Sequence, residues 1–258
     1  MSEFKKIVIV GATSAIAEHC ARLWVKNQGN QDNQDKPVDL VLLGRNNEKL
    51  EKIAADLRVR SPKSTIQVLN AEFFDPMIIQ KTVDTIIEQG PVDLVLIAQG
   101  FLPEQQDCQK DLTLCRDTLE ITAISPVIYA EAFAFAFENA NHGTIAIIGS
   151  VAGDRGRKSN YVYGSAKSLI KGYAQGLQHR FSGKNVKVIL INPGPTDTPM
   201  TIKYKEKGMK MASVEDVAEK IVEGIDKGKA TIYVPGIWLV IMWVVRHLPA
   251  FIFNKINV

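Results

Sequence analysis

The residues best suited to chemistry lie between Ser150 and Lys167, in the stretch SVAGDRGRKSNYVYGSAK. Ser150 ends an apolar run, and further along the stretch the pattern Tyr163-x-x-x-Lys167 begins. If this second part is helical, the phenol and the ammonium share a face, because residues i and i+4 are neighbours on a helix. A nearby cation lowers a tyrosine pKa from its ordinary value of about 10 and favours proton transfer to a substrate oxygen. Ser150 is expected to hold that oxygen by a hydrogen bond.

Three further segments accompany this stretch in a consistent order. The apolar run Thr144 to Ile148 precedes Ser150, a glycine-containing turn opens at Gly11, and Pro193-Gly194 follows another apolar run. A Tyr-x-x-x-Lys pattern alone is common on exposed helices, so these companions decide its meaning. With them, the chain resembles the short-chain dehydrogenase/reductase (SDR) family over roughly residues 5 to 235.

The segment that must position a cofactor begins at the N-terminus. Lys6 to Val10 is a β-branched run typical of a parallel strand buried on both faces, and a helix is expected from Glu18 to Asn27. The turn between them begins at Gly11. Free N–H groups and the helix dipole at such a turn favour the pyrophosphate of a dinucleotide.

Two alanines depart from the glycine pattern of the family in this turn. Where the family has Gly-x-x-x-Gly-x-Gly, this chain has Gly11, Ala15 and Ala17. Each alanine adds a methyl group where the backbone approaches phosphate or where helix meets strand. Alanine is the smallest replacement and a better helix former, so dinucleotide binding is still expected.

The second strand predicts which dinucleotide binds. After the polar segment Asn27 to Pro37, which is expected to be a surface loop, Val38 to Leu43 reads as a buried strand followed by Gly44, Arg45 and Asn46. No acidic side chain is available there for the adenosine ribose hydroxyls. The forked donors of Arg45 suit a 2′-phosphate, so NADP(H) is preferred over NAD(H).

The resemblance implies the remaining site residues. Two positions depart from the family: Gln99 stands in its Asn-Asn-Ala-Gly signature, and Thr122 stands where an asparagine holds a water. Glu72 stands where the family has an aspartate beside the adenine. The implied catalytic residues are Ser150, Tyr163, Lys167 and Thr122, with no metal. The implied cofactor-binding residues are Gly11, Thr13, Ser14, Ala15, Ile16, Arg45, Glu72, Phe73, Ala98, Gly100, Tyr163, Lys167, Pro193, Gly194, Thr196 and Thr198.

Alternating strand and helix patterns predict one α/β domain. We expect a doubly wound Rossmann sheet of about seven parallel strands, with helices on both faces, over residues 1–235. The composition, with 46% hydrophobic and 23% charged residues and a net charge of +3, is that of a globular protein and does not call for nucleic acid. The N-terminus enters a strand at once, so a cytoplasmic location is expected.

Residues 236–258 form an apolar tail with nine consecutive apolar residues from Ile237 to Val245. Because Arg246, His247 and Pro249 interrupt it, a bilayer-spanning helix is not expected. Three roles stay open for the tail: an oligomer interface, a wall of the substrate site, or a helix lying in the membrane surface. The tail and the opening GATSAIAE are similar to SDR reductases that resemble decaprenylphosphoryl-2-ketoribose reductase, which act on a lipid-linked sugar ketone.

The expected function is NADPH-dependent reduction of a substrate ketone, with Tyr163 as the proton donor. The carbonyl substrate is either a small molecule or lipid-linked, and four lysines between Met200 and Met211 would suit a phosphorylated one. The resemblance also implies a homo-oligomer, a dimer or a tetramer. Two alternatives stay open: a 3-oxoacyl-type or other soluble ketone reductase, and a non-catalytic nucleotide-binding scaffold.

Overall fold

The described chain folds around one parallel β-sheet. The structure is a computed structural model that describes residues 4–27 and 37–256. Its strands, in their order across the sheet, are β3 (Ile66–Asn70), β2 (Asp39–Gly44), β1 (Lys6–Val10), β4 (Leu94–Ile97), β5 (Gly143–Ile148), β6 (Val186–Pro193) and β7 (Thr231–Val234). All neighbouring strands pair in parallel, as predicted.

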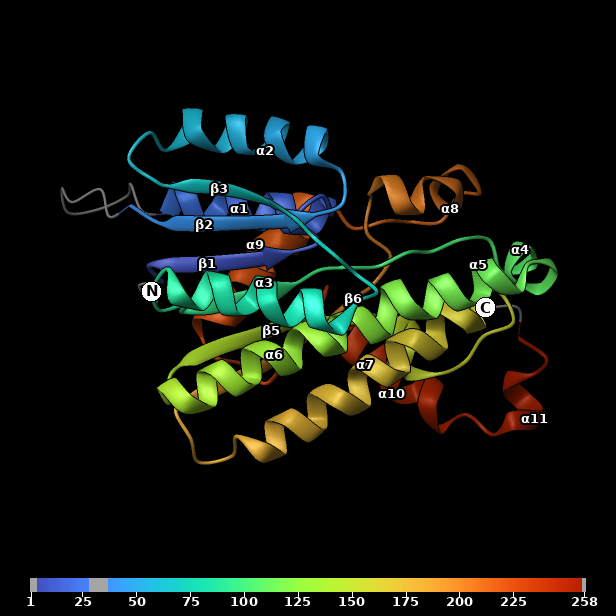
Figure 1. Cartoon of the computed structure of the whole chain (residues 1–258). Helices are drawn as coiled ribbons and strands as arrows, with labels where there is room; N and C mark the ends of the chain where they lie inside the picture. The colour runs from blue at the N-terminus through green and yellow to red at the C-terminus, as the bar shows by residue number, and fades with distance from the viewer. Residues whose placement is uncertain (1–3, 28–36, 257–258) are drawn as a thin grey trace.

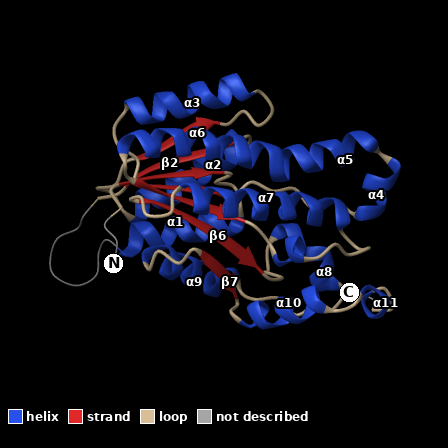
Figure 2. Cartoon of the chain, turned by 90° about the horizontal axis from the view of Figure 1, so that it is seen from below, coloured by secondary structure: helices blue, strands red, loops and turns tan. Residues whose placement is uncertain are grey.

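Helices cover both faces of this sheet (Figures 1 and 2). One face carries α1 (Ala15–Asn27), α2 (Asn47–Arg60) and α9 (Val214–Asp226); the other carries α3 (Pro76–Glu88), α6 (Ser125–Ala140) and α7 (Tyr161–Arg180). The alternate side chains of β1 enter different cores: Ile7 and Ile9 join the first, Val8 and Val10 the second. This burial on both faces explains why the central strands are continuous apolar runs.

The helix predicted from Leu112 to Asn139 is continuous but not uniform. It consists of α5 (Leu112–Leu119), the π-helical turn η1 (Glu120–Ile124) and α6. By length and composition this helix could cross a bilayer, yet Tyr129, Phe133 and Phe137 are fully buried and α6 packs against α3. It is therefore a core helix of this fold.

The chain returns repeatedly to the carboxyl ends of the strands. At this end lie α4 (Gln105–Lys110), α8 (Ile202–Glu206), α10 (Ile237–His247) and α11 (Ala250–Phe253), on the right of Figure 1. The short turns η2 (Val151–Asp154) and η3 (Pro199–Thr201) follow β5 and β6. Because the strand order reverses between β1 and β4, a ligand is expected to bind in this region.

The sequence-based boundaries differ slightly from these. Helix α1 begins at Ala15 rather than Glu18, so both alanines of the predicted turn lie in its first residues. The polar segment predicted as a loop from Asn27 to Pro37 falls mainly outside the described residues. Two short helices, α4 and α8, were not predicted.

Candidate active site

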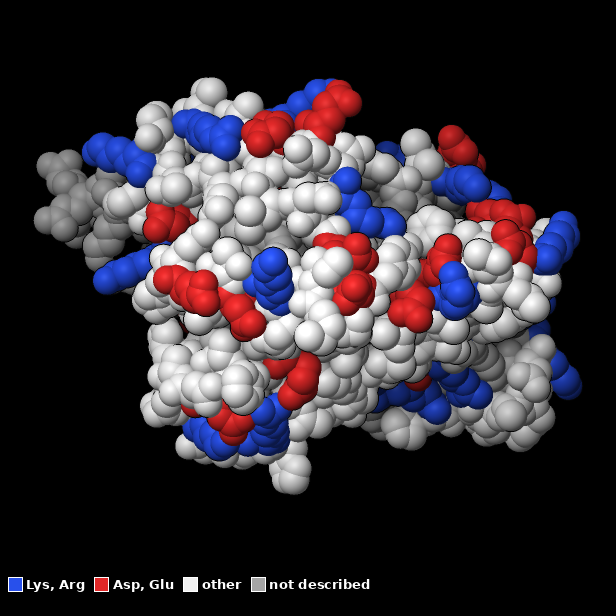
Figure 3. All heavy atoms as spheres, in the orientation of Figure 1, with Lys and Arg blue, Asp and Glu red and all other residues white. Residues whose placement is uncertain are grey.

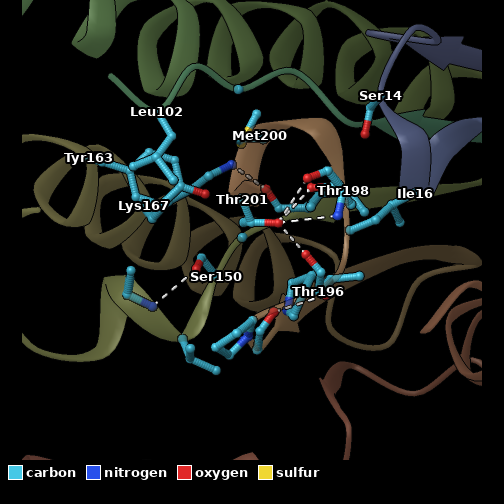
Figure 4. Close-up of a pocket in the computed structure, with 18 of the residues that line it drawn as sticks. Ser14, Ile16, Leu102, Ser150, Tyr163, Lys167, Thr196, Thr198, Met200 and Thr201 are labelled. Atoms are coloured by element: carbon cyan, nitrogen blue, oxygen red, sulfur yellow. Dashed lines mark hydrogen bonds between the residues drawn. The ribbon is translucent and has the colours of Figure 1, made fainter. Parts of the chain in front are cut away.

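A cavity of about 890 Å³ opens at the carboxyl ends of the strands (Figure 4). All but two of the site residues predicted from the sequence line it. They are Gly11, Thr13, Ser14, Ala15, Ile16, Arg45, Phe73, Ala98, Gly100, Ser150, Tyr163, Lys167, Pro193, Gly194, Thr196 and Thr198. Residues at or just after the carboxyl ends of β1 to β6 therefore line one cavity.

The turn after β1 requires a glycine. Gly11 has φ +82°, and a Cβ there would lie 2.8 Å from the backbone nitrogen of Gln99. Its N–H donates to the Leu43 carbonyl at 2.8 Å, which joins the turn to the end of β2. Ala15 begins α1 beside the cavity, whereas Ala17 is completely buried in the core. The methyl group of Ala17 thus fills space between helix and sheet and does not enter the cavity.

Arg45 lies at the end of β2 with an exposed side chain that lines the cavity. Its guanidinium is 4.9 Å from the centroid of the Phe73 ring, and the described residues include no carboxylate paired with it. Lys49 also lines this end, and its ammonium donates to the Thr13 carbonyl at 2.8 Å. Arg45 and Lys49 therefore both lie beside the turn after β1, where their positive charges would favour an anionic group.

The residues of the predicted catalytic set occupy the middle of the cavity. Ser150 follows β5 and is the N-cap residue of η2, and its hydroxyl accepts a hydrogen bond from the Ala152 N–H at 3.1 Å. Tyr163 and Lys167 are on consecutive turns of α7. Lys167 is buried, and its ammonium donates to the Ile148 carbonyl at 2.7 Å. The ammonium lies 5.8 Å from the centre of the Tyr163 ring.

Burial dominates the electrostatics of this pair. It raises the pKa of Tyr163 to about 12, against the lowering effect of a hydrogen bond with Ser150. It also lowers the pKa of Lys167 to about 7. The expectation that the tyrosine pKa lies below its ordinary value is therefore wrong, because burial raises it instead. The physical reason is that loss of water disfavours phenolate and ammonium alike.

Two predicted residues do not line the cavity. Thr122 is fully buried in the π-helical turn, where its hydroxyl donates to the Phe101 carbonyl at 3.1 Å and accepts from the Phe101 N–H at 3.0 Å. The Glu72 carboxylate accepts hydrogen bonds from the N–H groups of Phe73 and Phe74, at 2.8 and 2.6 Å. The Thr122 hydroxyl and the Glu72 carboxylate are therefore both engaged in hydrogen bonds to backbone groups.

Several lining residues were not among the predicted site residues. Gln99 donates from Nε2 to the Ser125 hydroxyl at 2.8 Å, while its Oε1 is buried with no partner among the described residues. The apolar part of the cavity is formed by Leu102, Met200, Tyr204, Trp238, Ile241, Met242 and Val245, none of which was named individually as a site residue. The last four lie on one face of α10. The spacing of these four residues by three or four positions was the available signal in the sequence for one face of a helix. A wall of the substrate site is one of the three roles that the sequence analysis left open for the tail.

Two contacts hold α10 in this position. The Trp238 ring packs so closely on Gly194 that a Cβ there would lie 2.1 Å from the indole nitrogen. At the other end, Arg155 donates to the carbonyls of Val245 at 2.5 Å and Leu248 at 2.6 Å. Its guanidinium also stacks 3.9 Å from the Phe253 ring centre. A cation at a helix C-terminus satisfies carbonyls that have no partner within the helix.

These features fit a dinucleotide. The cavity combines a left-handed glycine turn, the N-terminus of α1 and Arg45, which has no carboxylate partner among residues 4–27 and 37–256. Asn192 Nδ2 and Gln99 Oε1 are buried polar atoms without partners in the described part of the chain. The residues that would hold the group are those of the β1–α1 turn, Arg45, Lys167 and the loop after β6.

A family model described as short chain dehydrogenase matches residues 5–208. An uncharacterized oxidoreductase of Streptomyces coelicolor is 28% identical over 258 residues, covering 98% of this chain and 96% of the relative.

Two solved structures also resemble this one. A short-chain dehydrogenase from Sphingobium yanoikuyae in complex with NADPH has a TM-score of 0.76 at 20% identity, covering 95% of this chain and 96% of that one. A variant of actinorhodin polyketide ketoreductase with NADPH has a TM-score of 0.77 at 19% identity, covering 90% and 96%. At these identities the likeness to solved structures shows the fold alone.

Proposed function

Because the chain belongs to the short-chain dehydrogenase family and is an NAD(P)-dependent oxidoreductase, we propose that it reduces a substrate ketone to an alcohol with NADPH. One observation carries this proposal: Ser150, Tyr163 and Lys167 line the same cavity as the Gly11 turn. A scaffold without activity would not need a serine, a phenol and an ammonium together there. The bound nicotinamide would supply the hydride.

The side chains then have separate roles. Ser150 orients the substrate oxygen by a hydrogen bond, and Tyr163 gives that oxygen its phenolic proton. The raised pKa of Tyr163 keeps the phenol protonated at neutral pH, as a proton donor in the reductive direction must be. Lys167 would hold the nicotinamide ribose. Hydroxyl oxygens there would favour its ammonium form against the effect of burial.

The preference for NADP(H) over NAD(H) rests on Arg45. This exposed guanidinium has no acidic partner among the described residues, and its fork can bind a 2′-phosphate by two hydrogen bonds. Known proteins of this fold that are complexed with NADPH are consistent with this preference.

Titration of the purified protein with NADPH and NADH, followed by nicotinamide fluorescence, tests both cofactor claims. Arg45→Ala should weaken NADPH binding by about tenfold or more and leave NADH binding nearly unchanged. Arg116→Ala is the matched control, because this arginine on α5 is 73% exposed and does not line the cavity. If neither dinucleotide binds the wild type, the scaffold alternative replaces the enzyme.

The finer substrate class rests on α10. Its cavity-facing residues Trp238, Ile241 and Met242 provide an apolar wall that suits a long hydrocarbon, which favours a lipid-linked sugar ketone. A phosphorylated sugar ketone would instead be favoured by the basic segment, of which Lys210 lines the cavity. Its other residues are exposed: Ile237, Val240 and Trp243 are each about 60% accessible to solvent. We further propose a cytoplasmic protein whose α10 lies on the membrane surface. The rival is a soluble 3-oxoacyl-type reductase that uses this surface to form a dimer or tetramer.

A further inference from the structure

One cation in the cavity wall has no role in the reaction proposed above. Arg157 lies between η2 and α7 and lines the cavity beside α10. Its Nη2 is 3.4 Å from the Met242 sulfur, a weak acceptor. In the chain as described, its Nε is buried with no hydrogen-bond partner, and no carboxylate forms an ion pair with it.

The acidic group that acts on Arg157 already has other partners. Asp154 acts on Arg157 electrostatically, but one of its oxygens binds the Lys171 ammonium and the other accepts from the Tyr233 hydroxyl at 2.9 Å. Burial lowers the pKa of Arg157, although the guanidinium remains charged. Partial desolvation of a cation without an ion-pair partner costs free energy, and an anion entering the cavity would recover it.

The surroundings of Arg157 point to the substrate. Asn160 is the N-cap of α7 but makes no capping hydrogen bond, and its Oδ1 is buried and unpartnered within the described residues. Tyr163 follows in the first turn of the same helix. The proton donor of the reaction therefore stands close in the chain to an unpaired cation and an unpaired acceptor, all lining one cavity.

The cofactor does not account for this cation. The features that suit its phosphates are the Gly11 turn, the N-terminus of α1 and Arg45, which follow β1 and β2. Arg157 instead follows β5, and its guanidinium touches α10. It belongs to the part of the cavity with the apolar wall.

We propose that Arg157 binds an anionic group of the substrate, a carboxylate or a phosphate ester, while Asn160 accepts a hydrogen bond from a neighbouring hydroxyl. This inference rests on the proposed ketone reduction and narrows its substrates to anionic ketones. The guanidinium fork matches the paired oxygens of either anion. The wall of α10 would bind the apolar remainder.

Calorimetric titration of the enzyme saturated with NADP⁺ tests the inference, because the dinucleotide then fills the cofactor phosphate sites. The probes are phenyl phosphate, benzoate and neutral benzyl alcohol. Arg157→Met keeps an unbranched side chain against Met242 and should weaken anion binding at least tenfold without changing benzyl alcohol binding. Arg157→Lys keeps the charge without the fork and should give a smaller loss. Lys158→Met is the control, because the exposed Lys158 does not line the cavity.

The anion that binds more tightly, phenyl phosphate or benzoate, shows whether Arg157 prefers a phosphate ester or a carboxylate. Equal anion affinities in wild type and Arg157→Met, or no anion binding by wild type, would overturn the inference. Unchanged NADP⁺ affinity shows that a variant is folded. If Arg157→Met does not fold, the anion affinity of Arg157→Lys is compared with that of Lys158→Met. A weaker affinity in Arg157→Lys supports the inference, and equal affinities overturn it. Failure of wild type to bind NADP⁺ would instead contradict the proposed function.

Discussion

Lys167 illustrates how burial sets the chemistry of single residues. Its ammonium is held between the Ile148 carbonyl and the Tyr163 ring, and it is almost completely removed from solvent. Burial lowers its pKa from 10.5 to about 7. At low pH the folded protein must therefore bury an ammonium, at a cost in stability.

This shift predicts a pH dependence of stability. Between pH 7 and 10.5 the unfolded lysine holds a proton that the folded one does not, so the free energy of unfolding should rise with pH. Its contribution should approach about 1 kcal/mol per pH unit. Urea unfolding of wild type and Lys167→Met, compared from pH 7 to 10, measures it. A free-energy difference between the two proteins that does not rise with pH would contradict the shift.

The residues that form local patterns were the ones predicted from sequence. Ser150, Tyr163 and Lys167 follow from a strand end and a helical spacing, and all three line the same cavity, while their catalytic role stays a prediction. The contacts of Thr122 and Arg157 depend on segments far away in the chain, Phe101 and Met242 respectively. No local pattern encodes such contacts, so the sequence could not provide them.

At the scale of elements, α10 joins the tail to the active site. One face packs on the loop after β6 and lines the cavity, and the other is exposed. The central strands were predicted because burial on both faces demands continuous apolar runs. The short helices α4 and α8 were not, because a few polar residues carry no recognisable period. The π-helical turn likewise has no pattern of its own in the sequence.

The packing of α10 predicts the effect of adding one methyl group. Gly194→Ala would place a Cβ 2.1 Å from the Trp238 nitrogen, so the helix must move. We expect a loss of about 1–3 kcal/mol in stability and faster proteolysis of the tail. Gly236→Ala is the matched control, because a Cβ there meets nothing within 4 Å. Equal thermal midpoints for the two variants would show that α10 does not pack as described.

At the scale of the molecule, charged side chains of both signs are spread over the surface (Figure 3), whereas exposed apolar side chains gather on α10. Acidic and basic side chains are interspersed over the face shown in Figure 3. The segment 236–258 contains no acidic residue, while Arg246, His247 and Lys255 are basic. An apolar helix face bordered by cations suits an anionic lipid surface.

Vesicle sedimentation tests this membrane contact. Wild type should bind vesicles containing phosphatidylglycerol, and the double substitution Val240→Ser and Trp243→Ser should weaken binding by about tenfold or more. Phe135→Ser is the control, because Phe135 is 61% exposed on α6. If the double variant keeps its vesicle binding but changes from oligomer to monomer in light scattering, the surface is a subunit interface instead.

The central claim is that this cavity transfers hydride from NADPH to a ketone with Tyr163 as the proton donor. The most direct measurement follows deuterium from labelled NADPH into the alcohol product by mass spectrometry, with levulinate and its methyl ester among the ketones. We predict deuterium at the carbinol carbon, and a rate about 100- to 10,000-fold lower in Tyr163→Phe at unchanged NADPH affinity. Deuterium transfer that proceeds equally well in Tyr163→Phe, or no transfer to any ketone by a wild type that binds NADPH, would contradict the claim.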